Sequence, residues 1–143
     1  MKAVYATGTN YDDPLSVLEV GTMPEPETKP FWSTIRVNSA SVNHHDVWSL
    51  QGVGLSDEQT PMILGTDAAG VLEEDIPVRK GLKAGSEVVL YTFVGTDGAG
   101  VMPGERRSIL SERYAGTMAE YTQVPSANVF AKPANLNLDE AAA

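Results

Sequence analysis

Short apolar runs, separated by glycine and proline, set the pattern of this chain. Residues 2–5 and 15–20 are rich in β-forming side chains and flank the turn residues 8–14, so they predict a hairpin. Residues 34–40 alternate apolar and polar side chains with the period of two that is typical of a half-buried strand. Residues 87–94 are almost continuously apolar, which predicts a core strand buried on both faces. The pattern therefore predicts a mainly β domain.

Proline marks the connections between these strands. Residues 22–31 contain three prolines, which exclude a helix interior and a central strand, so this stretch is predicted to be an extended connector. Two further strands are predicted over residues 119–124 and 128–131, with Pro125 between them.

One short helix is predicted over residues 44–50. Asn43 precedes it as an N-cap, and Gly52 follows it at a position where a left-handed C-cap costs little. The side chains expected to pack in the core include Val47, Leu50, Trp48 and Tyr91.

The C-terminal residues predict the start of another helix. Asn137 and Glu140 have the spacing of a capping box, in which each side chain bonds the backbone of the other residue. A helix of one turn is too short to be stable alone. We therefore expect this helix to continue and the 143 residues to be a fragment of a longer chain.

Charge and composition narrow the possible partners. The formal charge is −9, and the basic pairs at 79–80 and 106–107 lie in predicted loops, so we expect no nucleic-acid partner. No apolar run approaches the roughly 20 residues that span a bilayer, and no signal peptide is evident, so we expect no membrane partner and a cytoplasmic location. The absence of cysteine excludes disulfides, thiolate nucleophiles and cysteine-ligated zinc.

The side chains best suited to chemistry lie on the predicted helix and in the stretch 61–70. His44 and His45 are adjacent on the helix, so they point about 100° apart and cannot readily face one metal ion. For either histidine taken alone, a purely structural role, with one on the surface and one packed, is as good an interpretation as a functional role. Asp46 lies in the first helical turn, where a negative charge is stabilised by the helix dipole, and Asp67 can order a turn by bonding nearby backbone. We therefore expect both to support a site rather than to react.

Five motifs occur in an order and spacing that resemble one known family. They are V-N-H-H-D at 42–46, P-M-I-L-G-T-D-A-A-G at 61–70, G-S-E-V-V-L at 85–90, G-T-M-A-E-Y at 116–121 and L-D-E-A-A-A at 138–143. In these motifs the chain is similar to the N-terminal catalytic domain of the medium-chain dehydrogenase/reductase superfamily. The resemblance implies a GroES-like, partly open β-barrel with a few short helices over residues 1–132. Residues 133–143 would begin the connection to a Rossmann domain that binds NAD(P).

The metal ligands of the family's zinc-dependent alcohol dehydrogenases are absent. In place of a cysteine and a histidine ligand this sequence has Asn43 and Thr66, whose amide and hydroxyl bind zinc poorly. The counterpart of the structural-zinc lobe, residues 95–114, has no cysteine. A dinucleotide fingerprint starting at Gly98 would need glycine where Pro103 stands, so we interpret that stretch as a loop. The resemblance is therefore to the zinc-independent quinone oxidoreductase branch, and no zinc is expected.

The resemblance also implies roles for individual side chains. His44 matches the family position that contacts the cofactor pyrophosphate, and His45 matches a hydroxyl that relays protons in the zinc enzymes. Asn43 and Thr66 would offer hydrogen bonds to a substrate carbonyl. The candidate site residues are thus Asn43, His44, His45, Asp46, Thr66 and Asp67.

The function implied is that of the substrate-side half of an oxidoreductase that uses NADPH or NADH. Its substrate would be a small-molecule carbonyl or quinone, with an enone, aldehyde or alcohol as possible forms. Its protein partners would be its own downstream Rossmann domain and a second copy in a homodimer, and the isolated fragment would be inactive. Two alternatives stay open: a free-standing GroES-like binding module of the co-chaperonin type, and a zinc-dependent alcohol dehydrogenase with displaced ligands.

Overall fold

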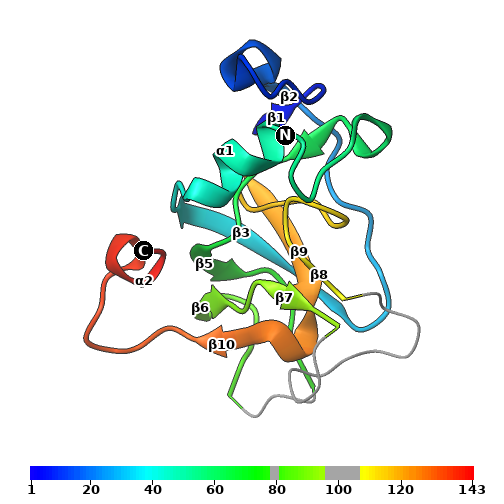
Figure 1. Ribbon diagram of the computed structural model, residues 1–143. Helices are drawn as coiled ribbons and strands as arrows, with labels where there is room; N and C mark the ends of the chain where they lie inside the picture. Colours follow the sequence, from blue (N-terminus) through cyan, green and yellow to red (C-terminus); the bar gives the residue numbers. More distant parts are fainter. Residues whose placement is uncertain (78–80, 96–106) are drawn as a thin grey trace.

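The computed structural model describes residues 1–77, 81–95 and 107–143 and has a mainly β architecture (Figure 1). The described strands form three antiparallel sheets, joined by short helices and turns. The strands are β1 (Lys2–Ala6), β2 (Leu18–Thr22), β3 (Trp32–Ala40), β4 (Met62–Ile63), β5 (Ala68–Leu72), β6 (Glu87–Leu90), β7 (Phe93–Val94), β8 (Ser108–Ile109), β9 (Tyr121–Pro125) and β10 (Val129–Ala131). The helices are α1 (His44–Leu50), α2 (Leu138–Ala141) and 3₁₀ helices at Pro14–Val17, Asp57–Gln59 and Ser126–Asn128.

The largest sheet has five strands in the order β10-β6-β5-β3-β9 and curls into a half-barrel (Figure 1). Strand β3 lies between β5 and β9 in this sheet and pairs with both, so that Ile35 lies opposite both Leu72 and Thr122. A bulge between Val37 and Ser39 bends β3 near the end that leads to α1. The predicted mainly β, partly open barrel is confirmed.

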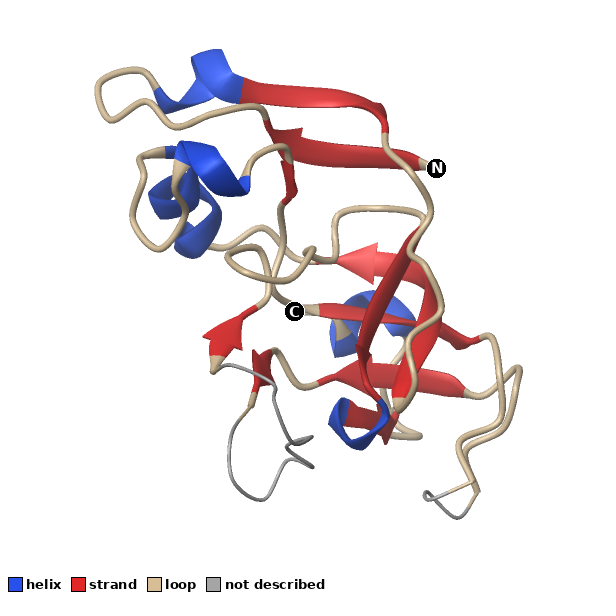
Figure 2. Cartoon of the chain, turned by 90° about the vertical axis from the view of Figure 1, so that its right-hand side faces the viewer, coloured by secondary structure: helices blue, strands red, loops and turns tan. Residues whose placement is uncertain are grey.

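A smaller sheet, in the order β2-β1-β4, lies to one side of the half-barrel (Figure 2). Its β1–β2 pair confirms the predicted hairpin, with Val4 opposite Val20. The strand predicted from residue 15 is wrong at its start, because residues 14–17 form a 3₁₀ helix. Pro14 at the first helical position favours this turn.

The segment 116–120 joins the two sheets. Met118 donates its backbone N–H to the Leu64 carbonyl at 2.8 Å and accepts the N–H of Val4 at 2.8 Å. Glu120 then accepts the N–H of Val37 at 2.9 Å, just before the chain enters β9. The end of β4 and the start of β5 are therefore held beside this segment.

Two apolar clusters fill the interior. One lies within the half-barrel and includes Ile35, Leu72, Val88, Val124 and Val129, each fully buried. The other lies below α1 and contains Ala6, Leu50, Leu55, Met62 and Leu64. Burial of Leu50 in this second cluster anchors α1 beside β4.

The single core strand predicted over residues 87–94 is wrong, because the structure divides it between β6 and β7 in different sheets. Asn128 causes the break: its buried Nδ2 donates to the carbonyls of Tyr91 at 2.9 Å and Phe93 at 2.8 Å. The carbonyls of Tyr91 and Phe93 thus bond one side chain instead of continuing the ladder of a single strand. Tyr91, expected in the core, is 41% exposed.

The predicted bounds of α1 are confirmed, but its buried face is not the predicted one. Leu50 is buried as expected, whereas Val47 and Trp48 are exposed. The helix turns Asp46 and Ser49 inward instead, together with Leu50. This occurs because Asp46 has hydrogen-bond partners inside the protein.

The C-terminal capping box is confirmed. Asn137 Oδ1 accepts the Glu140 N–H at 2.9 Å, and Glu140 Oε2 accepts the Asn137 N–H at 2.8 Å. The helix α2 that follows lies against β3, where Ser39 bonds Asp139. No helix among the described residues has the length and apolarity needed to cross a lipid bilayer.

We predict that Gly70→Ala destabilises the half-barrel. A Cβ at Gly70 would lie 2.2 Å from the backbone oxygen of Arg36 on β3, so the two strands would have to separate. The free energy of unfolding should fall by about 1–3 kcal/mol in urea denaturation.

The matched control is Gly8→Ala, where the nearest atom to a new Cβ would be 3.6 Å away, an ordinary contact distance. It should change the free energy of unfolding by no more than about 0.5 kcal/mol. Equal effects of the two substitutions would contradict the close approach of β3 and β5.

Candidate functional site

Three of the candidate residues form one hydrogen-bonded group, which we call the polar wall: Asn43, Thr66 and Asp67. Asn43 Nδ2 donates to Asp67 Oδ2 at 2.8 Å and to Thr66 Oγ1 at 3.1 Å. Thr66 Oγ1 donates in turn to the same Asp67 oxygen at 2.8 Å. The structure thus brings together residues from the start of α1 and from the turn before β5, as the resemblance implied.

Asp46 lies behind the wall and ties its two halves together. Its Oδ2 accepts the backbone N–H of Asn43 at 2.8 Å, and its Oδ1 accepts the backbone N–H of Gly65 at 2.9 Å. The residue is only 4% exposed. A buried carboxylate is stable only when such donors replace its water, so these two bonds set the distance between α1 and residue 65.

The turn that carries Thr66 and Asp67 depends on glycine. Gly65 has a φ of +94°, and a Cβ there would lie 2.5 Å from Thr117 Oγ1. That hydroxyl donates to the Asp67 carbonyl at 3.1 Å, while the Thr117 N–H donates to the Gly65 carbonyl at 3.1 Å. Thr117, in the segment 116–120, therefore holds the backbone of this turn in place.

Every side-chain hydrogen-bond donor of the polar wall has an acceptor within or beside the wall. The two amide hydrogens of Asn43 face three acceptor oxygens, because Ser41 Oγ also lies 3.2 Å from Nδ2. The Thr66 hydroxyl hydrogen is used by Asp67. Asp67 Oδ1 accepts no hydrogen bond from the described residues, and Asp67 is partly exposed. The wall therefore presents a free acceptor, which suits a ligand that brings a hydroxyl hydrogen.

The two histidines lie in different surroundings. His44 is exposed, and its ring centroid is 5.3 Å from that of Trp48, one turn along α1. The side chain of His45 is 17% exposed, and its Nε2 lies 3.2 Å from Glu112 Oε1. This arrangement matches the interpretation of one surface and one packed histidine. No hydrogen bond joins either ring to the polar wall within the described part of the chain.

Glu112 is a partner that sequence reasoning missed. It follows β8 and is separated from His45 by 67 positions. Neither a motif nor a helical spacing connects the two residues, so only the folded chain reveals the pair. The stretch 95–104, interpreted above as a loop, lies mostly outside the described residues.

The geometry of the wall does not fit a zinc ion. A metal ligand must turn a lone pair toward the ion, whereas Asn43 turns its N–H donors toward Thr66 and Asp67. In the described ranges, no three or more side chains of the His, Cys, Asp and Glu types gather closely enough to hold a metal ion.

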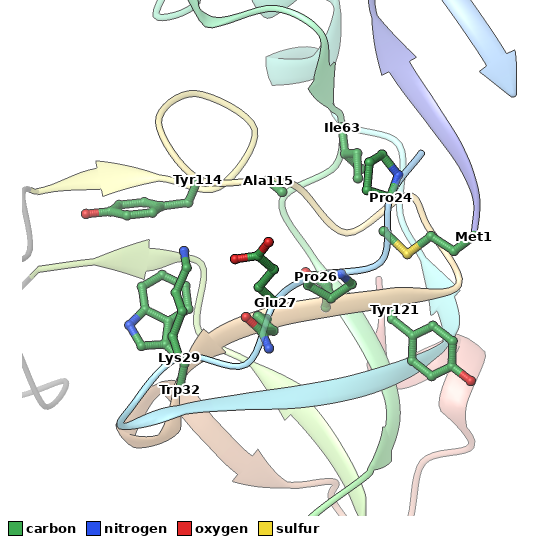
Figure 3. A pocket seen from close by; sticks show the side chains of 12 residues that line it. Met1, Pro24, Pro26, Glu27, Lys29, Trp32, Ile63, Tyr114, Ala115 and Tyr121 are labelled. Atoms are coloured by element: carbon green, nitrogen blue, oxygen red, sulfur yellow. The ribbon is translucent and has the colours of Figure 1, made fainter. Parts of the chain in front are cut away.

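The cavity in Figure 3 lies away from the polar wall, between the proline-containing connector and β9. Lys29 Nζ lies over the Trp32 ring at 4.6 Å, and the Trp32 and Tyr114 rings are 5.3 Å apart. The volume of about 180 Å³ is below the roughly 300 Å³ of small ligand sites. We interpret this cavity as a packing gap beneath the connector.

Comparisons with known proteins identify the family of this domain. The family model of the alcohol dehydrogenase GroES-like domain matches residues 29–134. A search of curated proteins found no match. A solved NAD-dependent alcohol dehydrogenase is 36% identical, with a TM-score of 0.81 over 99% of this chain and 42% of that chain.

Two more solved structures extend the comparison. A thermostable alcohol dehydrogenase from Pyrobaculum aerophilum, with cobalt and zinc bound, is 28% identical, with a TM-score of 0.78 over 99% of this chain and 44% of that one. The quinone oxidoreductase from Coxiella burnetii is 22% identical, with a TM-score of 0.73 over 99% of this chain and 40% of that one, and so shares the fold. The chain spans about two fifths of the length of each of these three proteins.

We predict that Asp46→Asn destabilises the chain. An amide has one acceptor oxygen, so its NH₂ group would face the N–H of either Asn43 or Gly65 in a buried place. The free energy of unfolding should fall by roughly 1.5–3 kcal/mol in urea denaturation.

Asp12→Asn is the matched control, because Asp12 is exposed in a turn. It should change the free energy of unfolding by no more than about 0.5 kcal/mol. Full stability of the Asp46→Asn variant would refute the view that this carboxylate holds the two segments together.

Proposed function

Because this chain belongs to the alcohol dehydrogenase GroES-like domain family of the medium-chain dehydrogenase/reductase superfamily, we propose that it is the substrate-side half of an NAD(P)H-dependent oxidoreductase. The observation that carries the proposal is the polar wall of Asn43, Thr66 and Asp67, held in place by Asp46. The proposed reaction is the reduction of a small-molecule carbonyl or quinone, or the reverse oxidation of an alcohol.

Zinc independence is part of the proposal. The donor hydrogens of Asn43 and Thr66 already bond acceptor oxygens within the wall, whereas a zinc ion would need side chains that turn lone pairs toward it. The metal-bound relative from Pyrobaculum aerophilum is 28% identical overall, so we propose that the present chain differs from it at this site.

We propose that the wall recognises the oxygen of the substrate. A nicotinamide cofactor, when bound, would supply the hydride. Asn43 faces more acceptors than it has hydrogens, so Asn43 and Thr66 can redirect a hydrogen toward a carbonyl oxygen while Asp67 stays bonded to the other donor. Asp67 Oδ1 would accept the hydroxyl hydrogen of the alcohol or hydroquinone form. The same wall can therefore bind both the carbonyl form and the hydroxyl form of the substrate.

The remaining partners follow from the family. The relatives are more than twice as long as this chain, which supports a Rossmann domain as its partner for cofactor binding. His44, exposed on α1, is the proposed contact to the cofactor pyrophosphate, and His45 is the proposed proton carrier. Dimerisation and a cytoplasmic location stay predictions, as does the choice between NADPH and NADH.

We predict that the 143-residue chain alone does not oxidise NADPH or NADH with any carbonyl or quinone. Joined to the Rossmann domain of its own gene product or of the NAD-dependent relative, it should do so without added metal. Absorbance of the reduced nicotinamide measures the reaction. A chain that stays inactive when joined, but binds a protein partner, would support the free-standing module.

Chelation tests the metal-free version. Activity of the joined protein should survive treatment with a chelator, and added zinc should not raise it. Activity that is abolished by the chelator and rescued by zinc would replace this proposal with that of a zinc enzyme with displaced ligands.

We predict that His44→Gln raises the KM for the cofactor roughly tenfold, which corresponds to a loss of about 1.4 kcal/mol of binding. The amide of glutamine is always uncharged and is a weaker donor to an anion. The matched variant His44→Arg presents a permanently charged donor and should keep the KM at or below that of the parent. A fall in kcat at constant KM in His44→Gln would contradict the assignment.

A further inference from the structure

His45 has a hydrogen-bonding environment of its own, separate from the polar wall. Its Nε2 lies 3.2 Å from Glu112 Oε1, and its Nδ1 lies 3.5 Å from Ser49 Oγ, one helical turn onward. The His45 side chain is 17% exposed and that of Glu112 is 26% exposed. The longer contact is at the limit of a hydrogen bond, so the pair with Glu112 determines how the ring is turned.

Glu112 is itself held from several sides. Ser108 Oγ donates to its Oε2 at 3.3 Å, and Gln59 Nε2 donates to its backbone carbonyl at 2.9 Å. Gly54, with a φ of +80°, makes the space for it, because a Cβ there would lie 2.3 Å from Glu112 Oε1. Segments that are distant in sequence therefore converge to fix one carboxylate against one imidazole.

We infer that Glu112 is the positioning residue of His45. A carboxylate beside one ring nitrogen selects the tautomer with hydrogen on that nitrogen and holds the plane of the ring. In His45 the hydrogen on Nε2 is therefore directed at Glu112, and Nδ1 is the nitrogen left for proton exchange. Glu112 does not touch the substrate; it acts through His45.

This inference deepens the proposed function and rests on it for its chemical meaning. In carbonyl reduction the substrate carbon gains a hydride and its oxygen gains one proton. That proton passes to the oxygen through Nδ1, while the hydrogen on Nε2 stays directed at Glu112. Nδ1 takes up from solvent the proton that it passes on, so one solvent proton is consumed for each hydride and the ring and the carboxylate end as they began.

The first experiment observes the ring directly in the 143-residue chain, which has only two histidines. We expect a downfield proton NMR resonance from the His45 Nε2–H, protected from exchange by Glu112, and none from the exposed His44. Glu112→Ala should abolish this resonance. Glu58→Ala, an exposed residue of the neighbouring 3₁₀ helix, is the control and should leave it unchanged.

The second experiment measures catalysis by the chain joined to its Rossmann domain. Glu112→Ala should lower kcat by roughly tenfold or more, because proton transfer is impaired, while the KM stays within about twofold. Glu112→Asp should recover part of the loss. His45→Gln should cause a similar loss, and the double variant should lose no more than either single one.

The two experiments separate the two proposals. If the joined protein transfers no hydride, the proposed function fails, and the resonance still decides whether Glu112 positions His45. A missing resonance in the parent chain, or one that persists in Glu112→Ala, overturns the inference. A variant that is less stable but keeps its kcat also overturns it, since Glu112 would then only anchor its own segment.

Discussion

The buried carboxylate of Asp46 is the interaction on which the site depends. Its two oxygens accept backbone N–H groups from Asn43 and Gly65, which lie on separate segments. Water cannot replace either donor at a residue that is 4% exposed, so both segments must stay within hydrogen-bond distance of one carboxylate. The position of Asn43 relative to the turn at Thr66 and Asp67 follows from this constraint.

The sheets provide the second half of this arrangement. The segment 116–120 bonds β1, the end of β4 and β3 within a few residues, and it can lie so close only because glycine occupies the contact. A Cβ on Gly116 would lie 2.2 Å from the Leu64 oxygen. Thr117 is thereby brought beside the turn and holds the Asp67 carbonyl. The polar wall is thus located where the half-barrel and the smaller sheet meet.

The polar wall and the His45–Glu112 pair are two separate hydrogen-bonded groups. In the wall, Asn43 and Thr66 orient Asp67 and leave one carboxylate oxygen free for a ligand. In α1's first turn, His45 is paired with Glu112 and makes no hydrogen bond to the wall within the described residues. A carboxylate oxygen with no hydrogen bond and a histidine–carboxylate pair are both present, and the described residues hold no set of three metal ligands. This division of roles distinguishes the site from one organised around a single ion.

The sequence by itself determined the strand-rich architecture, the bounds of α1 and the capping box at Asn137, because these depend on local periodicity, glycine and capping residues. The family was indicated by the resemblance of five motifs. Through the same resemblance, Asn43, Thr66 and Asp67 were among the six candidate site residues. Only the tertiary structure decided that Asn128 divides the run 87–94, that α1 turns Asp46 rather than Val47 inward, and that Glu112 meets His45. Each of these depends on a hydrogen bond between residues at least 19 positions apart, and no local pattern encodes a partner at that distance.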